Sequence, residues 1–180
     1  KGLTINPQSG KMGMRASSTA EVVFEDCPVP EENRLGGEGE GFKETMQTLN
    51  TSRIAIASQC VGIAQAAYEA AVQYAKQREA FGKHLADFQA IQWKIADMAT
   101  RIDAARLLTW RAAQLRDKGE RCSLQAAQAK LMASTACNFA ADECLQIHGG
   151  AGRFGSCRCR ALLPMRRCRS RTWNEGIHTN

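Results

Sequence analysis

Apolar side chains recur at steps of three and four residues between residues 87 and 118, and this period predicts a long amphipathic helix. Gly119 follows the last of these positions, where a glycine commonly ends a helix. The side chains expected to form one continuous buried stripe are Phe88, Ile91, Ile95, Met98, Ile102, Ala105, Thr109 and Ala112.

Three further helices are expected, a short one at residues 41–49 and longer ones at 51–77 and 123–147. No proline occurs between residues 31 and 163, so the strongest helix breaker is absent from this part of the sequence. Three long helices with short connections are typical of an up-and-down bundle, and the C-terminal tail is expected to supply a further helix. The helix at 51–77 is apolar around much of its circumference, at Ile54, Ile56, Val61, Ile63, Ala67 and Ala71, which indicates more than one neighbour.

The N-terminal segment has a different pattern. Residues 20–25 are β-prone with partial alternation, residues 3–5 form a weaker candidate strand, and Cys27-Pro28-Val29-Pro30 forces an extended exit. The predicted fold is mainly α, an up-and-down helical bundle preceded by a short β remnant. Residues 1–30 are interpreted as the end of a β-domain and 31–180 as a C-terminal helical-bundle domain. Because the chain opens on Lys1 in mid-pattern, we expect its true N-terminus to lie upstream.

Composition agrees with the helical interpretation and narrows the classes of protein. Hydrophobic residues make up 44% and aromatic residues only 6%, which suits closely packed helices better than a β-sandwich. No apolar run in the sequence is long enough to span a bilayer, and no charged-then-apolar stretch at its start is expected to act as a signal peptide.

The net charge of +6 is confined to the tail. Residues 1–150 carry 17 Lys+Arg and 17 Asp+Glu, whereas residues 151–180 carry seven arginines and one acid, so that 7 − 1 = +6. A nucleic-acid-binding face would be built into the folded surface. Binding of nucleic acid through the arginine tail is therefore only a minor alternative.

Eight cysteines is a high count, but their wide spacing resembles no secreted disulfide framework and indicates a reducing compartment. Cys60 and Cys137 lie among small apolar residues, as buried thiols do. Cys157, Cys159 and Cys168 with His178 could be considered a zinc site, but their spacing matches no standard finger, and no metal is expected.

Six short motifs occur in order along residues 1–150. They are KMGMRASST (11–19), VFEDCPVP (23–30), GEGF (39–42), REAFG (78–82), FQAIQ (88–92) and QIHGG (146–150). Each motif alone is weak, but their order and spacing resemble those of the acyl-CoA dehydrogenase family, in particular its short- and medium-chain members.

The resemblance implies FAD, an acyl-CoA substrate and a homotetramer, with electron-transfer flavoprotein as electron acceptor. It implies that Arg78 faces the FAD pyrophosphate and that Phe81 and Gln89 line the cofactor. The turn of Gln146, Ile147, His148, Gly149 and Gly150 would approach the ADP half of an FAD bound mainly by a neighbouring subunit. Arginine suits a diphosphate through bidentate bonds, and a Gly-Gly turn lets backbone approach a ligand. The ordinary alternatives are a solvated arginine at a helix end and glycines that only stop a helix.

The substrate side is implied at Arg53 and Gly176, and the catalytic base at Glu175. Many members of the family have Asp where Asn50 stands. The reaction needs a carboxylate that removes the proton alpha to the thioester, and Trp173-Asn174-Glu175-Gly176 resembles the stretch that supplies it. A minority branch uses a glutamate at the position of Ser52, and serine cannot serve as that base.

Residues 151–174 depart from the family pattern. An arginine- and cysteine-rich run of almost the same length replaces an acidic, tyrosine-rich helix. Our hypothesis is a local reading-frame or sequencing error, which peptide sequencing that returned this tail would refute.

The resemblance leaves one main alternative for the function, a non-catalytic helical assembly module or an incomplete fragment of the same fold. A mitochondrial matrix and a bacterial cytoplasm fit the resemblance equally well.

Overall fold

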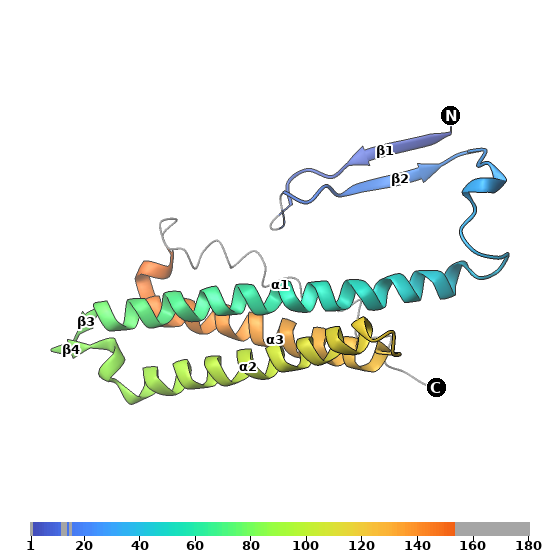
Figure 1. Ribbon diagram of the computed structural model, residues 1–180. Coiled ribbons are helices and arrows are strands. Elements are labelled where there is room, and N and C mark those ends of the chain that lie inside the picture. The colour runs from blue at the N-terminus through green and yellow to red at the C-terminus, as the bar shows by residue number, and fades with distance from the viewer. Residues whose placement is uncertain (1, 12–13, 15, 154–180) are drawn as a thin grey trace. The chain divides into compact units, whose positions relative to one another are not determined.

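The computed structural model describes residues 2–11, 14 and 16–153 and consists mainly of three long helices (Figure 1). The predicted fold class, a helical bundle preceded by a β remnant, is confirmed. The chain divides into two compact units, Lys1–Leu49 and Asn50–Asn180. The expected tail helix, Glu175, Gly176 and the tail cysteines with His178 lie outside the described residues.

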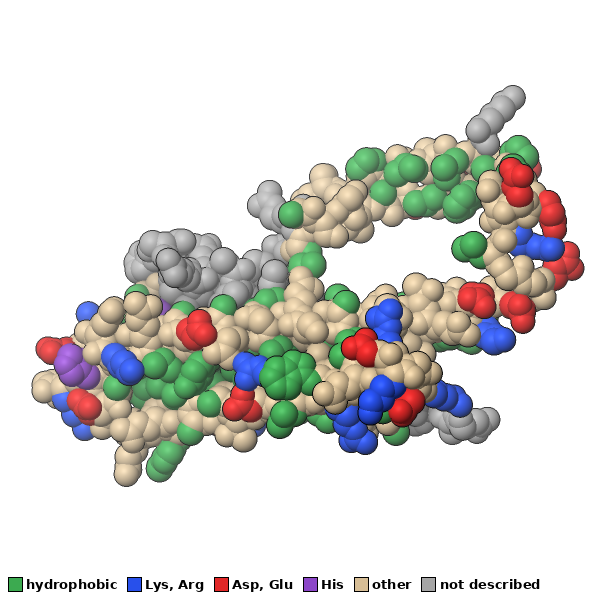
Figure 2. Space-filling model, in the orientation of Figure 1, with side chains coloured by type: hydrophobic (Ala, Val, Ile, Leu, Met, Phe, Trp, Pro, Cys, Tyr) green, Lys and Arg blue, Asp and Glu red, His purple; other side chains and the backbone are tan. Residues whose placement is uncertain are grey.

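The first unit contains an antiparallel strand pair, β1 (Leu3–Pro7) and β2 (Ala20–Phe24), which pair from Leu3 opposite Phe24 to Pro7 opposite Ala20. Both predicted strands are thereby confirmed. Apolar side chains gather on this pair (Figure 2). Four of them are between 49% and 67% exposed: Leu3, Ile5, Val22 and Phe24. Two strands alone are marginally stable in water, so the assignment of residues 1–30 to a larger β-domain stays a prediction.

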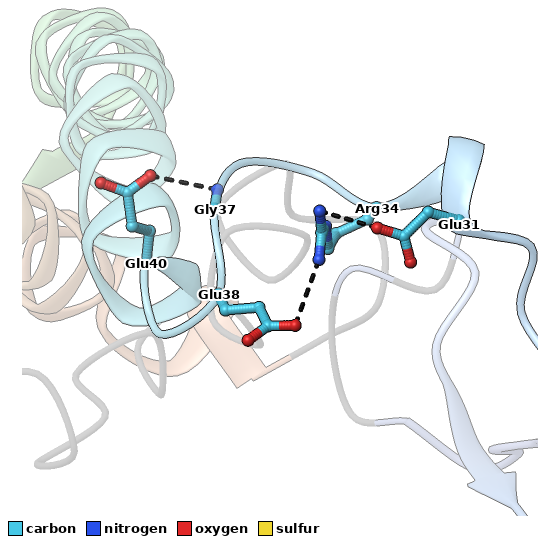
Figure 3. A network of polar contacts seen from close by, with 5 residues as sticks. All are labelled: Glu31, Arg34, Gly37, Glu38 and Glu40. Atoms are coloured by element: carbon cyan, nitrogen blue, oxygen red, sulfur yellow. Dashed lines mark hydrogen bonds and ion pairs between the residues drawn. The ribbon is translucent and has the colours of Figure 1, made fainter.

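A polar network orders the segment between β2 and α1 (Gly41–Gln77) (Figure 3). Arg34 Nη2 lies 2.7 Å from Oε1 of Glu31, a residue of the 3-10 helix η1 (Glu31–Asn33). Arg34 Nη1 lies 3.4 Å from Glu38 Oε1. The Gly37 N–H donates to Glu40 Oε2 at 3.1 Å. All of these side chains are exposed, so each ion pair contributes at most about 1 kcal/mol. The network defines the path of the chain into α1.

Helix α1 is continuous from Gly41 to Gln77, and the predicted separation into helices at 41–49 and 51–77 is wrong. Asn50-Thr51-Ser52, at the predicted boundary, has weak helix propensity but lies within the helix. Asparagine interrupts helices when its side chain bonds to nearby backbone. In the structure the Asn50 amide bonds instead to the side chains of Arg53 and Ser123, so the backbone stays helical.

Helices α2 (Gln89–Asp117) and α3 (Ser123–His148) complete the bundle and pack closely against each other. Both lie within one or two residues of their predicted bounds. The predicted stripe on α2 is confirmed for Met98, Ile102, Ala105, Thr109 and Ala112, which are buried. Phe88, Ile91 and Ile95 are half-buried. Alanine supplies most of the core positions of α1 and α3, and its small side chain permits close approach of the backbones. The core alanines of α3 are Ala126, Ala129, Ala133, Ala136 and Ala140.

Gly119 ends α2 as predicted. It adopts a φ of +75°, and its N–H donates to Arg116 O at 2.9 Å while the Glu120 N–H donates to Leu115 O at 3.0 Å. These two bonds form a Schellman motif, which satisfies carbonyls that the end of the helix leaves unpaired.

Two cysteines face each other in the core. Cys60 and Cys137 are both buried, as predicted, and neither forms a disulfide. A hydrogen bond from the Cys137 thiol lowers the pKa of Cys60 below its ordinary value, against the opposing effect of burial, and Lys130 lowers it further.

Within the described ranges, no helix combines the length and apolar character that a membrane span requires. The same residues contain no group of three His, Cys, Asp or Glu side chains that could hold a metal ion.

Candidate functional site

Arg78 lies where α1 ends and a short hairpin begins. Its N–H donates to Tyr74 O at 2.9 Å, which completes the last helical turn, and its carbonyl accepts from the Leu85 N–H at 2.9 Å. Between these two bonds lie the antiparallel strands β3 (Glu79–Ala80) and β4 (Lys83–His84), which the sequence analysis did not predict. The backbone at Arg78 is therefore fixed on both sides, while its side chain is exposed.

Phe81 occupies the tip of this hairpin. Phe81 and Gly82 have φ values of +53° and +80°, and two successive positive φ values are what a tight two-residue hairpin turn requires. Such a conformation is unfavourable for phenylalanine. The ring is 97% exposed, and the aromatic ring that it meets among the described residues is Phe88, edge-on with centroids 6.5 Å apart. An apolar ring held in solvent by a strained backbone indicates a binding role rather than a packing role.

Gln89 is the first residue of α2 and is also exposed. It follows the 3-10 helix η2 (Leu85–Asp87) and Phe88. Lys83 Nζ lies over the Phe88 ring, 4.2 Å from its centroid. The hairpin and the start of α2 thus bring together all three of Arg78, Phe81 and Gln89.

The second predicted element, the turn from Gln146 to Gly150, ends α3. Gln146 and both glycines are exposed, whereas Ile147 and His148 are buried and anchor the turn. Gly149 has a φ of +52°, and its N–H caps the helix by donating to Gln146 O and Leu145 O. The chain continues in a 3-10 helix, η3 (Gly149–Arg153). A glycine turn of this kind leaves backbone open to close approach by a ligand.

Tyr74 joins these two elements. Its ring stacks on His148 with centroids 4.2 Å apart and an interplanar angle of 23°. His148 Nδ1 lies 2.7 Å from Cys144 O, and because a carbonyl only accepts, Nδ1 carries the proton. The hairpin after α1 and the turn after α3 therefore lie at the same end of the bundle (Figure 1). We call this end the hairpin end.

Arg53 lies on the same helix as Tyr74 but far from it. At ~1.5 Å per residue, the helical rise places Arg53 roughly 36 Å from Gln77, the last residue of α1. Arg53 is half-buried, and its Nη1 donates to Asn50 Oδ1 at 2.8 Å. Asn50 Nδ2 in turn donates to Ser123 Oγ, on the first residue of α3, at 2.9 Å. The structure thus separates Arg53 from the predicted cofactor residues.

The sequence analysis missed two residues that make contacts between helices, Tyr74 and Ser123. Tyr74 precedes Arg78 by one helical turn, and an aromatic residue at that place could have indicated a buried partner. Ser123 carried only the signal of a helix start. Glu175 and Gly176 lie outside the described residues, so their predicted roles stay predictions.

The chain is similar to acyl-CoA dehydrogenases over most of its length. The family model for the acyl-CoA dehydrogenase C-terminal domain matches residues 39–177. The mitochondrial short-chain specific acyl-CoA dehydrogenase of Rattus norvegicus is 52% identical over 151 residues, which cover 84% of this chain and 37% of the rat protein. The CarC subunit of the caffeyl-CoA reductase-Etf complex of Acetobacterium woodii is 42% identical, over 98% of this chain and 46% of that subunit.

A solved structure gives the same result for the fold. Butyryl-CoA dehydrogenase from Megasphaera elsdenii superposes with a TM-score of 0.89 and 42% identity, over 93% of this chain and 44% of that one. The chain spans less than half the length of each of these three relatives. The match of motifs, helical domain and family model shows that this chain belongs to the acyl-CoA dehydrogenase family, of which it contains the C-terminal domain.

Proposed function

We propose that the protein containing this chain is an FAD-dependent acyl-CoA dehydrogenase. It would introduce a double bond between the α and β carbons of an acyl-CoA thioester and pass the electrons to electron-transfer flavoprotein. The names of its relatives support this class of reaction, and the relative from an Etf complex supports the acceptor.

The observation that carries the proposal is the chemistry gathered at the hairpin end. Arg78 offers an exposed guanidinium suited to a diphosphate, Phe81 offers an exposed ring that can cover an aromatic heterocycle, and Gly149 and Gly150 offer open backbone. This set fits the diphosphate and adenosine half of FAD. When bound, FAD supplies the hydride acceptor of the reaction.

The separation along α1 supports a site shared between subunits. Arg53 and the hairpin end are roughly 36 Å apart by the helical rise, which exceeds the length of an extended flavin dinucleotide. In this proposal, Arg78, Phe81 and Gln89 hold the flavin of a neighbouring subunit, together with the turn from Gln146 to Gly150. Arg53 serves the substrate site of its own subunit, within a homotetramer.

Catalysis in this proposal depends on Glu175, which removes the α proton of the thioester, and Gly176 lies beside the substrate. The carboxylate accepts the proton while the hydride leaves the β carbon. This step requires no other acid or base group from this chain. Relatives from mitochondria and from a bacterium leave the mitochondrial matrix and the bacterial cytoplasm as the proposed compartments.

The proposal is tested by anaerobic titration of the purified full-length protein with butyryl-CoA. Loss of the visible flavin absorbance, restored on addition of electron-transfer flavoprotein, is the expected result. The Glu175→Gln variant should bind butyryl-CoA without bleaching, because the amide cannot accept the proton. A stable tetramer that contains no flavin would instead support a helical assembly module and contradict the proposal.

A further inference from the structure

Helices α1 and α3 run parallel along a shared seam, and two contacts fix how they align. Asn50 on α1 bonds to Ser123 on α3, and the partners are 73 positions apart in the chain. Tyr74 on α1 stacks on His148 on α3, and these partners are 74 positions apart. The alignment of the two helices is therefore the same at both contacts.

Cys60 and Cys137 meet across this seam, between the two outer contacts. They are 77 positions apart, which lies within one helical turn of the alignment that the outer contacts define. Both belong to the buried core, and alanines such as Ala64 and Ala133 lie one turn away on each helix. The Cys137 thiol donates a hydrogen bond to the Cys60 sulfur, so the two side chains point toward each other. Small neighbours permit the close approach of two backbones that a disulfide requires.

Exposure distinguishes this pair from the third cysteine of the core. Cys60 and Cys137 each keep 5% of their surface exposed, whereas Cys144 is 0% exposed. Cys144 Sγ lies 3.8 Å from His148 Nδ1, at the hairpin end. The pair therefore retains contact with solvent that Cys144 lacks.

The thiol of Cys60 is also more reactive than its burial suggests. A thiol in apolar surroundings is ordinarily inert, because burial raises its pKa and the thiolate is the nucleophile. At Cys60 the hydrogen bond from Cys137 outweighs burial, and the charge of Lys130 acts in the same direction, so the pKa is lowered. A larger fraction of Cys60 is therefore present as thiolate.

We propose that Cys60 and Cys137 form a peroxide-oxidisable pair, in which Cys60 reacts first and Cys137 resolves the product. The Cys60 thiolate attacks one oxygen of hydrogen peroxide, the O–O bond breaks, and uptake of one proton gives a sulfenic acid and water. The Cys137 sulfur then attacks the Cys60 sulfur, and the hydroxyl group leaves with the thiol proton as a second water. Two thiols are oxidised to one disulfide while one peroxide is reduced to two waters. The pair is independent of the proposed function.

The experiment treats the purified full-length protein with hydrogen peroxide and maps its peptides by mass spectrometry without reduction. We expect the peptides of Cys60 and Cys137 to be joined with the loss of two hydrogen atoms, and dithiothreitol to separate them. Cys144 should remain a free thiol in the same sample. In Cys137→Ser the cross-link should be lost and dimedone should label Cys60 as a sulfenic acid. In Cys60→Ser both the cross-link and dimedone labelling of Cys137 should be absent.

Two controls separate a preformed pair from random oxidation. Cys27→Ser changes a half-buried cysteine of the other compact unit and should leave the yield of the cross-link unchanged. In denaturing urea, where all eight cysteines are accessible, the same treatment should give several different cross-links. Free Cys60 and Cys137 after treatment of the native protein would overturn the proposal. Oxidation of Cys144 as fast as that of Cys60 would also overturn it, because peroxide would then act on an opened core.

Discussion

Tyr74 and His148 stack face to face with ring centroids 4.2 Å apart, although 74 positions separate them in the chain. Tyr74 lies on the last turns of α1, and His148 is the last residue of α3. Both helix ends carry segments that we propose to contact FAD. The stack therefore fixes the position of the hairpin after α1 relative to the glycine turn after α3.

Replacing Tyr74 by leucine should lower the free energy of unfolding by about 1 kcal/mol beyond the loss of buried area, because the stacked pair is lost. The same variant should release FAD faster, since the two segments are no longer held together. Tyr74→Phe keeps the ring and is the matched control. Urea denaturation and flavin release measured by fluorescence check both effects, and identical behaviour of the two variants would contradict a role for the stack.

Phe81 is expected to stabilise cofactor binding at a cost to folding. Asparagine tolerates a positive φ, so Phe81→Asn should raise the free energy of unfolding by about 1 kcal/mol. Loss of the exposed ring should weaken FAD binding about three- to tenfold. Thermal unfolding of the apoprotein and FAD titration measure the two effects separately. A variant that is less stable would show that the ring packs against the chain after all.

Two glycines provide a matched test of the helical architecture. Gly62 lies within α1, and a methyl group added there meets no described atom within 4 Å apart from its chain neighbours and the nearby backbone of its own helix. Gly62→Ala should therefore stabilise the protein by about 0.5–1 kcal/mol. Gly119 has a φ of +75°, so Gly119→Ala should destabilise it by about 1 kcal/mol. Chemical denaturation measures both changes. Shifts of the same sign would show that one of the two helix descriptions is wrong.

The Cys60–Cys137 contact predicts a pH dependence of stability. The pKa of Cys60 is lower in the folded protein than in the unfolded chain, so folding favours the thiolate. This contribution is fully present above the unfolded pKa and is lost as the pH falls through the folded pKa. The free energy of unfolding should therefore rise with pH in the window just below the ordinary thiol pKa.

Cys137→Ala removes the hydrogen bond that lowers this pKa and should abolish the rise. Because the variant also leaves a small cavity, the slope of stability against pH is compared rather than its absolute value. Urea denaturation at a series of pH values gives that slope. An unchanged slope in Cys137→Ala would contradict the assigned cause.

The period of apolar residues was sufficient to predict α2 and its buried face, because burial on one side of a helix leaves a repeating record in the sequence. Continuity of α1 through Asn50 could not be predicted, since it depends on Ser123, which is distant in the chain. The β3–β4 hairpin was missed because each strand has only two residues and its turn places phenylalanine at a positive φ.

The sequence predicted the residues of the candidate site but not that they lie at the same end of the bundle. The motifs containing Arg78, Phe81, Gln89 and Gly149 indicated which residues to examine, and the structure places them at one end of the bundle. Their common location depends on the Tyr74–His148 contact between two helices, which no local pattern encodes. Local sequence identifies candidate groups, whereas packing between distant segments determines which of them can act on the same ligand.

The unbroken length of α1 has a genetic consequence under the proposed shared site. A defect at Arg53, within α1, and a defect at Phe81, in the hairpin that follows α1, would damage different active sites in an assembled tetramer. Two inactive alleles, one with each defect, would then yield some mixed tetramers with an intact pair of half-sites. Cells that carry both alleles are expected to recover part of the activity that neither allele gives alone.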